Sequence, residues 1–264
     1  MTAYSYPATT ARTDYLPVLN FEINPSLLTL EAVCQQQRIL PAYSLVLGLC
    51  EDQLPLVLDL TEPTTGSLLI AGDSGFANTT MLHSILTSAF LLNTESEVNI
   101  HLISPQADSL THFHNQRNFK ISYQPERKEC EIVLEEMTSL IESRQQRSKS
   151  DPIHVLFIDS LDILWNTLSP QARIWLNWIT TYGPQHGMMV IGTLETDYLS
   201  PRLHQLVDCF PSRIMGSMRK QSQARYLAGI NVSNIAELTP ELEYITVSDG
   251  ASFRIQLLPS ENDG

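Results

Sequence analysis

Short apolar stretches alternate along the chain with longer segments in which apolar residues recur at helical spacing. The short stretches predict strands, at residues 44–49, 56–60, 68–72, 98–103, 153–159, 187–193, 244–247 and 253–257. The longer segments predict helices over residues 25–37, 79–92, 125–149 and 170–182. Strands that alternate with helices at this spacing form βαβ units, so the pattern predicts an α/β fold with a mostly parallel central sheet flanked by helices.

Two pairs of these strands are predicted to form peripheral β-hairpins. Residues 50–55 join the first pair, and a turn at Asp249 and Gly250 joins the second. An Asp-Gly dipeptide suits a tight antiparallel turn because glycine tolerates the positive φ that such turns need.

The predicted helices carry two further expectations. The hydroxyl of Thr79 is placed to open the helix that runs to Leu92. In residues 125–149 one apolar stripe is expected to be buried, and it consists of Ile132, Leu134, Met137, Leu140 and Ile141.

The length and composition favour one domain. With 264 residues, 43% of them hydrophobic, the chain can bury one sizeable core. Residues 1–26 are rich in Thr, Tyr, Pro and Asn and follow no sustained period, which predicts an extended N-terminal arm. We therefore divide the chain into this arm, a single domain over residues 27–258 and a polar tail over residues 259–264.

Cysteine usage and charge narrow the class of protein. The four cysteines lie far apart and form no C-x-x-C pair, which favours reduced thiols in a cytoplasmic protein. No run of about 18 apolar residues occurs, so the sequence predicts no membrane span. The formal net charge of −13 argues against a surface that binds DNA as a whole. A local basic face is still compatible with this net charge.

The strand of residues 68–72 leads into a small-residue loop and a helix, which is the layout of a phosphate-binding loop. A working Walker A motif reads G-x-x-x-x-G-K-[ST]: its backbone N–H groups and lysine hold phosphates, and its hydroxyl binds Mg²⁺. Here Gly72 and Thr79 match, but Ala77 replaces the second glycine and Asn78 replaces the lysine. Because asparagine has no positive charge, the loop is expected to hold at most a weakened nucleotide. The alternative is an ordinary turn between a strand and a helix.

Asp159 is the second informative position because it follows a run of apolar residues at the end of a predicted strand. Ligands of parallel sheets gather at the carboxyl ends of strands, where P-loop enzymes use such an aspartate to hold Mg²⁺. A helix cap is the alternative. In P-loop enzymes the residue after this aspartate is commonly a glutamate that activates water. Here that residue is Ser160, whose hydroxyl cannot act as a base near neutral pH. Asp162 could take the role of the glutamate only if the backbone turns the Asp162 side chain inward.

Over residues 41–258 the sequence resembles the motor domain of the FtsK/SpoIIIE family, within the FtsK/HerA group of RecA-like P-loop ATPases. The matching segments, in chain order, are residues 45–48, 55–60, 68–72, 136–137, 158–164, 186–193, 210–214 and 223–227. The resemblance implies a nucleotide-driven hexameric ring that moves DNA or, as in the related type VII secretion ATPases, a tandem array of domains that handles protein. It also implies that ATP or ADP with Mg²⁺ is bound, here weakly, by Gly72, Gly75, Asn78, Thr79, Thr80, Asp159 and Thr193, with weakly bound Mg²⁺ on Thr79 and Asp159.

The departures from the family are as informative as the match. The Walker A lysine and second glycine are missing, Ser160 stands where the glutamate is expected, and Leu194 replaces the glutamine expected after Thr193. By the same resemblance Arg213 or Arg225 could reach a neighbouring subunit's nucleotide. The alternative for these arginines is a solvated face with salt-bridge partners. His112 and His114 form an H-x-H pattern with no third metal ligand nearby.

Three functions remain open. The favoured one is a degenerate FtsK-like domain that does not hydrolyse ATP and acts as a non-catalytic subunit or scaffold, with a protein partner or a homo- or hetero-oligomer of FtsK-like subunits. The second is an active or weak ATP-dependent DNA translocase that uses Asp162 and a lysine or arginine supplied from elsewhere. The third is a protein-substrate recognition module of a secretion machine, in which the vacated site receives a peptide.

Overall fold

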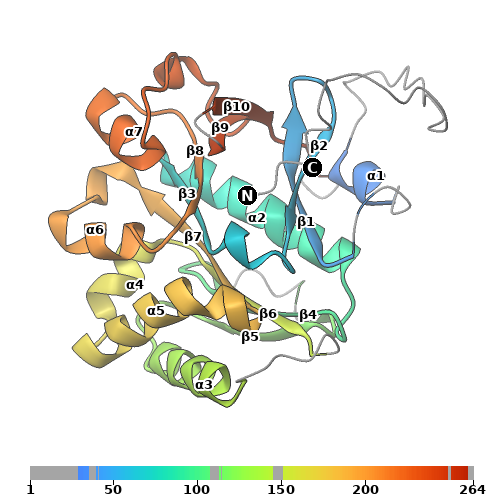
Figure 1. Ribbon diagram of the computed structural model, residues 1–264, viewed down its shortest axis with the longest axis vertical. Coiled ribbons are helices and arrows are strands. Elements are labelled where there is room, and N and C mark those ends of the chain that lie inside the picture. Colours follow the sequence, from blue (N-terminus) through green and yellow to red (C-terminus); the bar gives the residue numbers. More distant parts are fainter. Residues whose placement is uncertain are drawn as a thin grey trace.

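The computed structural model describes residues 29–35, 40, 42–107, 113, 115–144, 151–248 and 251–260 (Figure 1). The predicted N-terminal arm, the Asp249–Gly250 turn, the last part of the helix predicted over residues 125–149, and His112 and His114 lie outside these residues. The division into an arm, one domain and a tail therefore stays a prediction.

The described strands form one ten-stranded sheet in the order β2-β1-β10-β9-β8-β3-β7-β6-β4-β5. The strands are β1 (Ser44–Cys50), β2 (Pro55–Asp59), β3 (Leu68–Gly72), β4 (Val98–Ile103), β5 (Phe119–Tyr123), β6 (Ile153–Ile158), β7 (Met188–Glu195), β8 (Ser212–Met215), β9 (Glu243–Ser248) and β10 (Ala251–Gln256). From β8 to β5 neighbouring strands are parallel, and from β2 to β8 they are antiparallel. The α/β prediction is confirmed, and the two predicted hairpins extend the central sheet itself.

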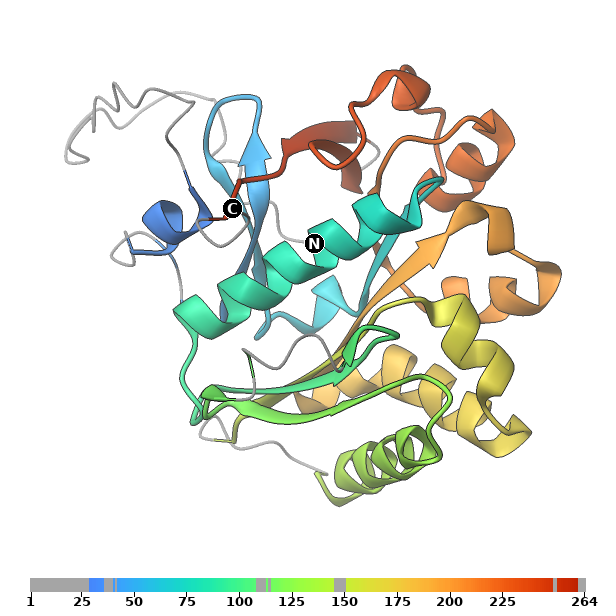
Figure 2. The same cartoon turned by 180° about the vertical axis from the view of Figure 1, so that it is seen from behind.

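Helices cover both faces of the sheet (Figures 1 and 2). They are α1 (Leu30–Gln35), α2 (Gly75–Leu92), α3 (Glu129–Ser143), α4 (Leu161–Thr167), α5 (Pro170–Tyr182), α6 (Pro201–Val207) and α7 (Gln221–Ala228). One core cluster joins one face of the sheet to α2, and a second joins the other face to α3 through α7. Along β3, Leu68 and Ile70 enter the first cluster while Leu69 and Ala71 enter the second, as expected of a strand buried on both faces.

Two helix predictions are wrong in detail. Helix α2 begins at Gly75 instead of Thr79, because the Ser74 side chain accepts a hydrogen bond from the Ala77 backbone N–H and caps the helix there. Ile132 of α3 is 52% exposed, and Cys130 and Val133 occupy the buried stripe in its place. A shift of one position rotates a residue by about 100° around a helix, which is enough to move it from core to solvent.

Strand β8, helices α4, α6 and α7, and edge strand β5 were not predicted. Each is short, and β5 is only half-buried, so its apolar pattern is weak. All four cysteines are free thiols, in agreement with the sequence. Within the described residues, no helix combines the length and the apolar character needed to cross a membrane.

A pair of histidines lies inside the parallel half of the sheet. His101 of β4 and His154 of β6 approach each other with 3.1 Å between Nε2 of the first ring and Nδ1 of the second, and the two rings are stacked. Burial and the neighbouring His154 lower the pKa of His101 to about 3. The folded protein therefore holds His101 neutral across the physiological range.

Because His101 stays neutral in the folded state, we expect the folded protein to become less stable against unfolding in mild acid. Below the ordinary pKa of 6.5 the unfolded chain binds a proton that folded His101 does not accept until about pH 3. The free energy of unfolding should therefore fall by up to about 1.4 kcal/mol per pH unit on acidification through this range. His101→Phe should reduce that slope in denaturant titrations between about pH 7 and pH 5. Equal slopes for the variant and the natural chain would refute the assignment.

Candidate functional site

The candidate site lies where the parallel strands β3, β6 and β7 end. Strand β3 ends at Gly72, which is paired with Glu195 at the end of β7. Strand β6 lies on the other side of β7, and Asp159 follows its last residue. The segment from Gly72 to Thr79 therefore forms a strand-to-helix elbow beside Asp159, as predicted.

Three hydroxyl groups converge on the buried Asp159 carboxylate. Its Oδ1 accepts hydrogen bonds from Thr79 Oγ1 at 2.8 Å and from Thr193 Oγ1 at 3.0 Å. Its Oδ2 accepts one from Ser104 Oγ at 3.2 Å. The structure thus brings together Thr79, Asp159 and Thr193. Ser104 was not predicted, although its position directly after the apolar run of β4 is a signal that could have found it.

Backbone N–H groups between the end of β3 and the first turn of α2 are hydrogen-bonded within the protein. The Asp73 N–H donates to Ser217 O at 3.0 Å, and the Ala77 N–H donates to Ser74 Oγ at 3.2 Å. The Asn78 N–H donates to Ser74 O at 3.1 Å. A phosphate-binding loop must offer such N–H groups to its ligand, and here at least these three are already used inside the protein.

Asn78 occupies the interior of the elbow. Its side chain is 1% exposed, and its Nδ2 donates to Leu194 O at 3.0 Å and to Gly72 O at 3.3 Å. Its Oδ1 is buried with no hydrogen-bond partner, and it lies so close to Gly72 that a Cβ there would be 2.9 Å away. The amide therefore joins the end of β3 to β7, and it adds no positive charge to the site.

The other predicted residues of the loop lie at the end of β3 and in the first turns of α2, and their contact with a nucleotide stays a prediction. Gly72 ends β3, and Gly75 is the first residue of α2. The Thr80 hydroxyl donates to Phe76 O at 3.0 Å, within its own helix. Leu194, at the position where the family has glutamine, is fully buried.

Carboxylates surround the elbow. Ser160 has a left-handed backbone with φ of 69°, and Asp162 in the following turn is 7% exposed. Burial and the charge of Asp159 raise the pKa of Asp162. Burial and the charges of Asp162, Asp197 and Asp73 raise the pKa of Glu195, whose Oε2 would lie 2.8 Å from a Cβ on Gly75. This concentration of negative charge opposes the binding of a polyphosphate.

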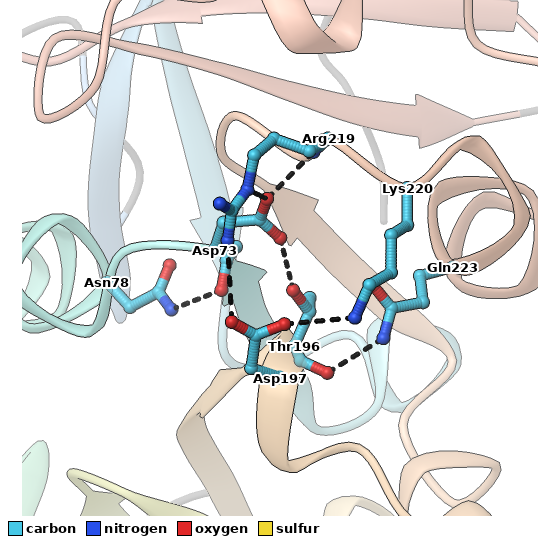
Figure 3. Close-up of polar contacts among 8 residues, drawn as sticks. Asp73, Asn78, Thr196, Asp197, Arg219, Lys220 and Gln223 are labelled. Atoms are coloured by element: carbon cyan, nitrogen blue, oxygen red, sulfur yellow. Dashed lines mark hydrogen bonds and ion pairs between the residues drawn. The ribbon is translucent and has the colours of Figure 1, made fainter.

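A polar network closes the outer side of the loop (Figure 3). Asp73 Oδ2 accepts hydrogen bonds from the Arg219 backbone N–H at 2.7 Å and from Arg219 Nε at 3.0 Å, and its Oδ1 accepts one from the Thr196 hydroxyl. Burial alone would raise the pKa of Asp73, but the hydrogen bonds from Thr196 and Arg219 outweigh it and lower that pKa. Asp197 pairs with Lys220 at 3.1 Å and with Arg219 at 3.4 Å.

The two arginines considered for contact with a neighbouring subunit are both engaged within the chain. Arg213 donates to the carbonyl groups of Val207, Phe210 and Leu227 at 2.9–3.1 Å. These bonds bind its guanidinium to the ends of α6 and α7. A role of Arg213 between subunits stays a prediction. Arg225 is exposed and donates to Asn231 Oδ1 through Nε and Nη2. Among the described residues, no group of three His, Cys, Asp or Glu side chains could hold a metal ion.

Comparison with known proteins finds similarity at the level of structure. No protein-family model and no curated protein matches the chain. EssC (ATPases 2 and 3) from Geobacillus thermodenitrificans superposes with a TM-score of 0.67 and 16% identity, over 84% of this chain and 46% of EssC. EccC (ATPases 2 and 3) from Thermomonospora curvata, in complex with a signal sequence peptide, gives a TM-score of 0.64 and 14% identity, over 84% of this chain and 41% of EccC.

A third neighbour comes from conjugation. The pCW3 conjugation coupling protein TcpA, in a monomer form with ATPγS, gives a TM-score of 0.63 and 11% identity, over 84% of this chain and 68% of TcpA. The chain spans less than half the length of the EssC and EccC structures that it matches. At these identities the similarity establishes the fold. The chain therefore has the fold of FtsK/HerA-type P-loop ATPase domains, in agreement with the resemblance seen in its sequence.

Proposed function

We propose that the chain is a degenerate FtsK-like domain that does not hydrolyse ATP and acts as a non-catalytic subunit or scaffold in a larger translocation assembly. The observation that carries the proposal is the buried Asn78 amide, which is bonded to Gly72 O and Leu194 O where a Walker A lysine would serve the phosphates. Phosphoryl transfer depends on positioned positive charge, so its loss removes the main source of transition-state stabilisation.

The predicted nucleotide site fits Mg²⁺ better than it fits a triphosphate. Thr79 and Asp159 supply a hydroxyl and a carboxylate at the elbow, which are suitable oxygen ligands for Mg²⁺. The phosphate side does not fit, because N–H groups of the loop are bonded internally and the buried Asn78 side chain brings no positive charge. We therefore assign no step of a reaction to bound nucleotide in this arrangement.

The glutamate that activates water in P-loop ATPases is replaced by Ser160. Ser160 cannot act as a base near neutral pH. Asp162 is turned inward, as the second candidate function requires, and its raised pKa would suit a base. That second function, a weakly active ATPase, would still need a cation to replace the missing lysine. Losing the lysine and the glutamate together should raise the barrier by several kcal/mol.

The proposed partner is another FtsK-like domain. The EssC and EccC structures each contain ATPases 2 and 3, and this chain matches under half of each, so domains of this fold occur in tandem there. A protein-substrate role is the third candidate, favoured by the signal sequence peptide in the EccC complex. DNA is disfavoured by the net charge of −13. We propose that the chain acts in the cytoplasm, which is consistent with its four free thiols.

Phosphate release tests the absence of hydrolysis. The natural chain, mixed with ATP and Mg²⁺, should release phosphate no faster than Thr79→Ala and Asp159→Ala variants purified in the same way. These two changes remove the hydroxyl and the carboxylate at the elbow, so any true activity must fall in them. Release by the natural chain that clearly exceeds both variants would support the weakly active ATPase instead.

Stability tests the proposed structural role of Asn78. Asn78→Leu keeps the side-chain volume but leaves Gly72 O and Leu194 O without their donor, so the free energy of unfolding should fall by about 2–3 kcal/mol. Asn166→Leu on the exposed side of α4 is the matched control and should change it by less than about 0.5 kcal/mol. Equal denaturation midpoints for Asn78→Leu and the natural chain would contradict this role.

A further inference from the structure

The Asp73 carboxylate is held by donors from two segments that follow other strands. Thr196 belongs to the 3₁₀ turn after β7, and Arg219 lies between β8 and α7. Asp73 itself follows β3, between β7 and β8 in the sheet. One carboxylate therefore ties together the ends of three adjacent parallel strands (Figure 3).

The donors around Asp73 are of the kinds that proteins use to bind an oxyanion. They are a backbone N–H, a hydroxyl group and a guanidinium N–H, and charge-assisted hydrogen bonds of this type are short and strong. Lys220 adds a second positive charge, which Asp197 balances. The site would accept a phosphate or sulfate if Asp73 did not already fill it.

The exposed fractions of the Arg219 and Asp73 side chains indicate which contacts of the network contribute to stability. The Arg219 side chain is 76% exposed, so its ion pair with Asp73 contributes little by itself. The Asp73 side chain is only 15% exposed, and it also receives the Thr196 hydroxyl and a backbone N–H. Removing the carboxylate would leave these donors unpaired and one positive charge unbalanced.

We propose that Asp73 is an internal ligand, whose carboxylate occupies a latent oxyanion site formed by Thr196 and Arg219 and thereby fixes the ends of β3, β7 and β8 without any bound nucleotide. The inference rests on the proposed function and adds to it the means by which the site stays closed. It explains how a domain of this fold can present a constant shape to its partners. It also identifies inorganic phosphate as the chemistry that the emptied site should take.

The test compares Asp73→Ala with Glu135→Ala, a change of the same charge at an exposed position on α3. Asp73→Ala should lower the melting temperature by about 3–6 °C, whereas Glu135→Ala should leave it nearly unchanged. Inorganic phosphate at about ten times its dissociation constant should then raise the melting temperature of Asp73→Ala by about 3 °C. Chloride at equal ionic strength should not, and neither protein that keeps Asp73 should respond to phosphate.

A second variant and a direct measurement complete the test. The Asp73→Ala, Arg219→Ala double variant should lose the response to phosphate. In the natural chain, hydrogen exchange at the Arg219 amide should be slowed at least tenfold relative to an unstructured peptide, even if Asp73→Ala does not fold. Rapid exchange at that amide, or the same phosphate response in Asp73→Ala and Glu135→Ala, overturns the inference. Neither readout involves ATP hydrolysis, so failure of this test would leave the proposed function standing. Release of phosphate from ATP by the natural chain would instead refute the proposed function and leave the role of Asp73 standing.

Discussion

The Asn78 amide is the contact on which the rest of the site depends. By donating to a carbonyl of β3 and a carbonyl of β7, it holds the two strand ends together at the point where P-loop ATPases keep a gap for phosphates. A lysine at this position would carry a charge that needs an anion, and an asparagine does not. Helix α2 begins at Gly75, where Ser74 caps it, and two residues lie between strand and helix. The internal hydrogen bonds of the loop and the uncharged Asn78 side chain thus occur at the same elbow.

The polar contacts around Asp159 contribute to the fold. Asp159 still receives the hydroxyl groups of Thr79 and Thr193, and with Ser104 they satisfy a buried carboxylate without any cation. An unsatisfied buried carboxylate would be costly, so these hydroxyl groups have a structural reason to remain even where hydrolysis is absent. Asp162 and Glu195 lie near the same point, and burial is the main cause that raises both pKa values. The charge of Asp159 adds to the shift of Asp162, and the charges of Asp162, Asp197 and Asp73 add to that of Glu195. The site is therefore polar, and its carboxylates oppose the binding of a polyphosphate.

The sequence predicted most of the sheet because its strands are long, apolar and bounded by turn residues. It also predicted the elbow and the approach of Asp159 to Thr79, since parallel strands must end at the same edge. It could not predict the closing network, because Asp73, Thr196 and Arg219 are far apart in the chain and meet only after folding. The cap at Ser74 was missed because serine and threonine are both common capping residues, so residue type alone does not decide between Ser74 and Thr79. Strand β8 was missed because a four-residue strand has too few positions to show a pattern.

Calorimetric titration of the natural chain with ATP and Mg²⁺ shows whether the elbow is closed to a triphosphate. We expect no saturable heat of binding, because the internal hydrogen bonds of Asp73, Ala77 and Asn78 leave the phosphates too few donors. Saturable binding in the micromolar range would refute a closed elbow, since that affinity requires an open phosphate cradle.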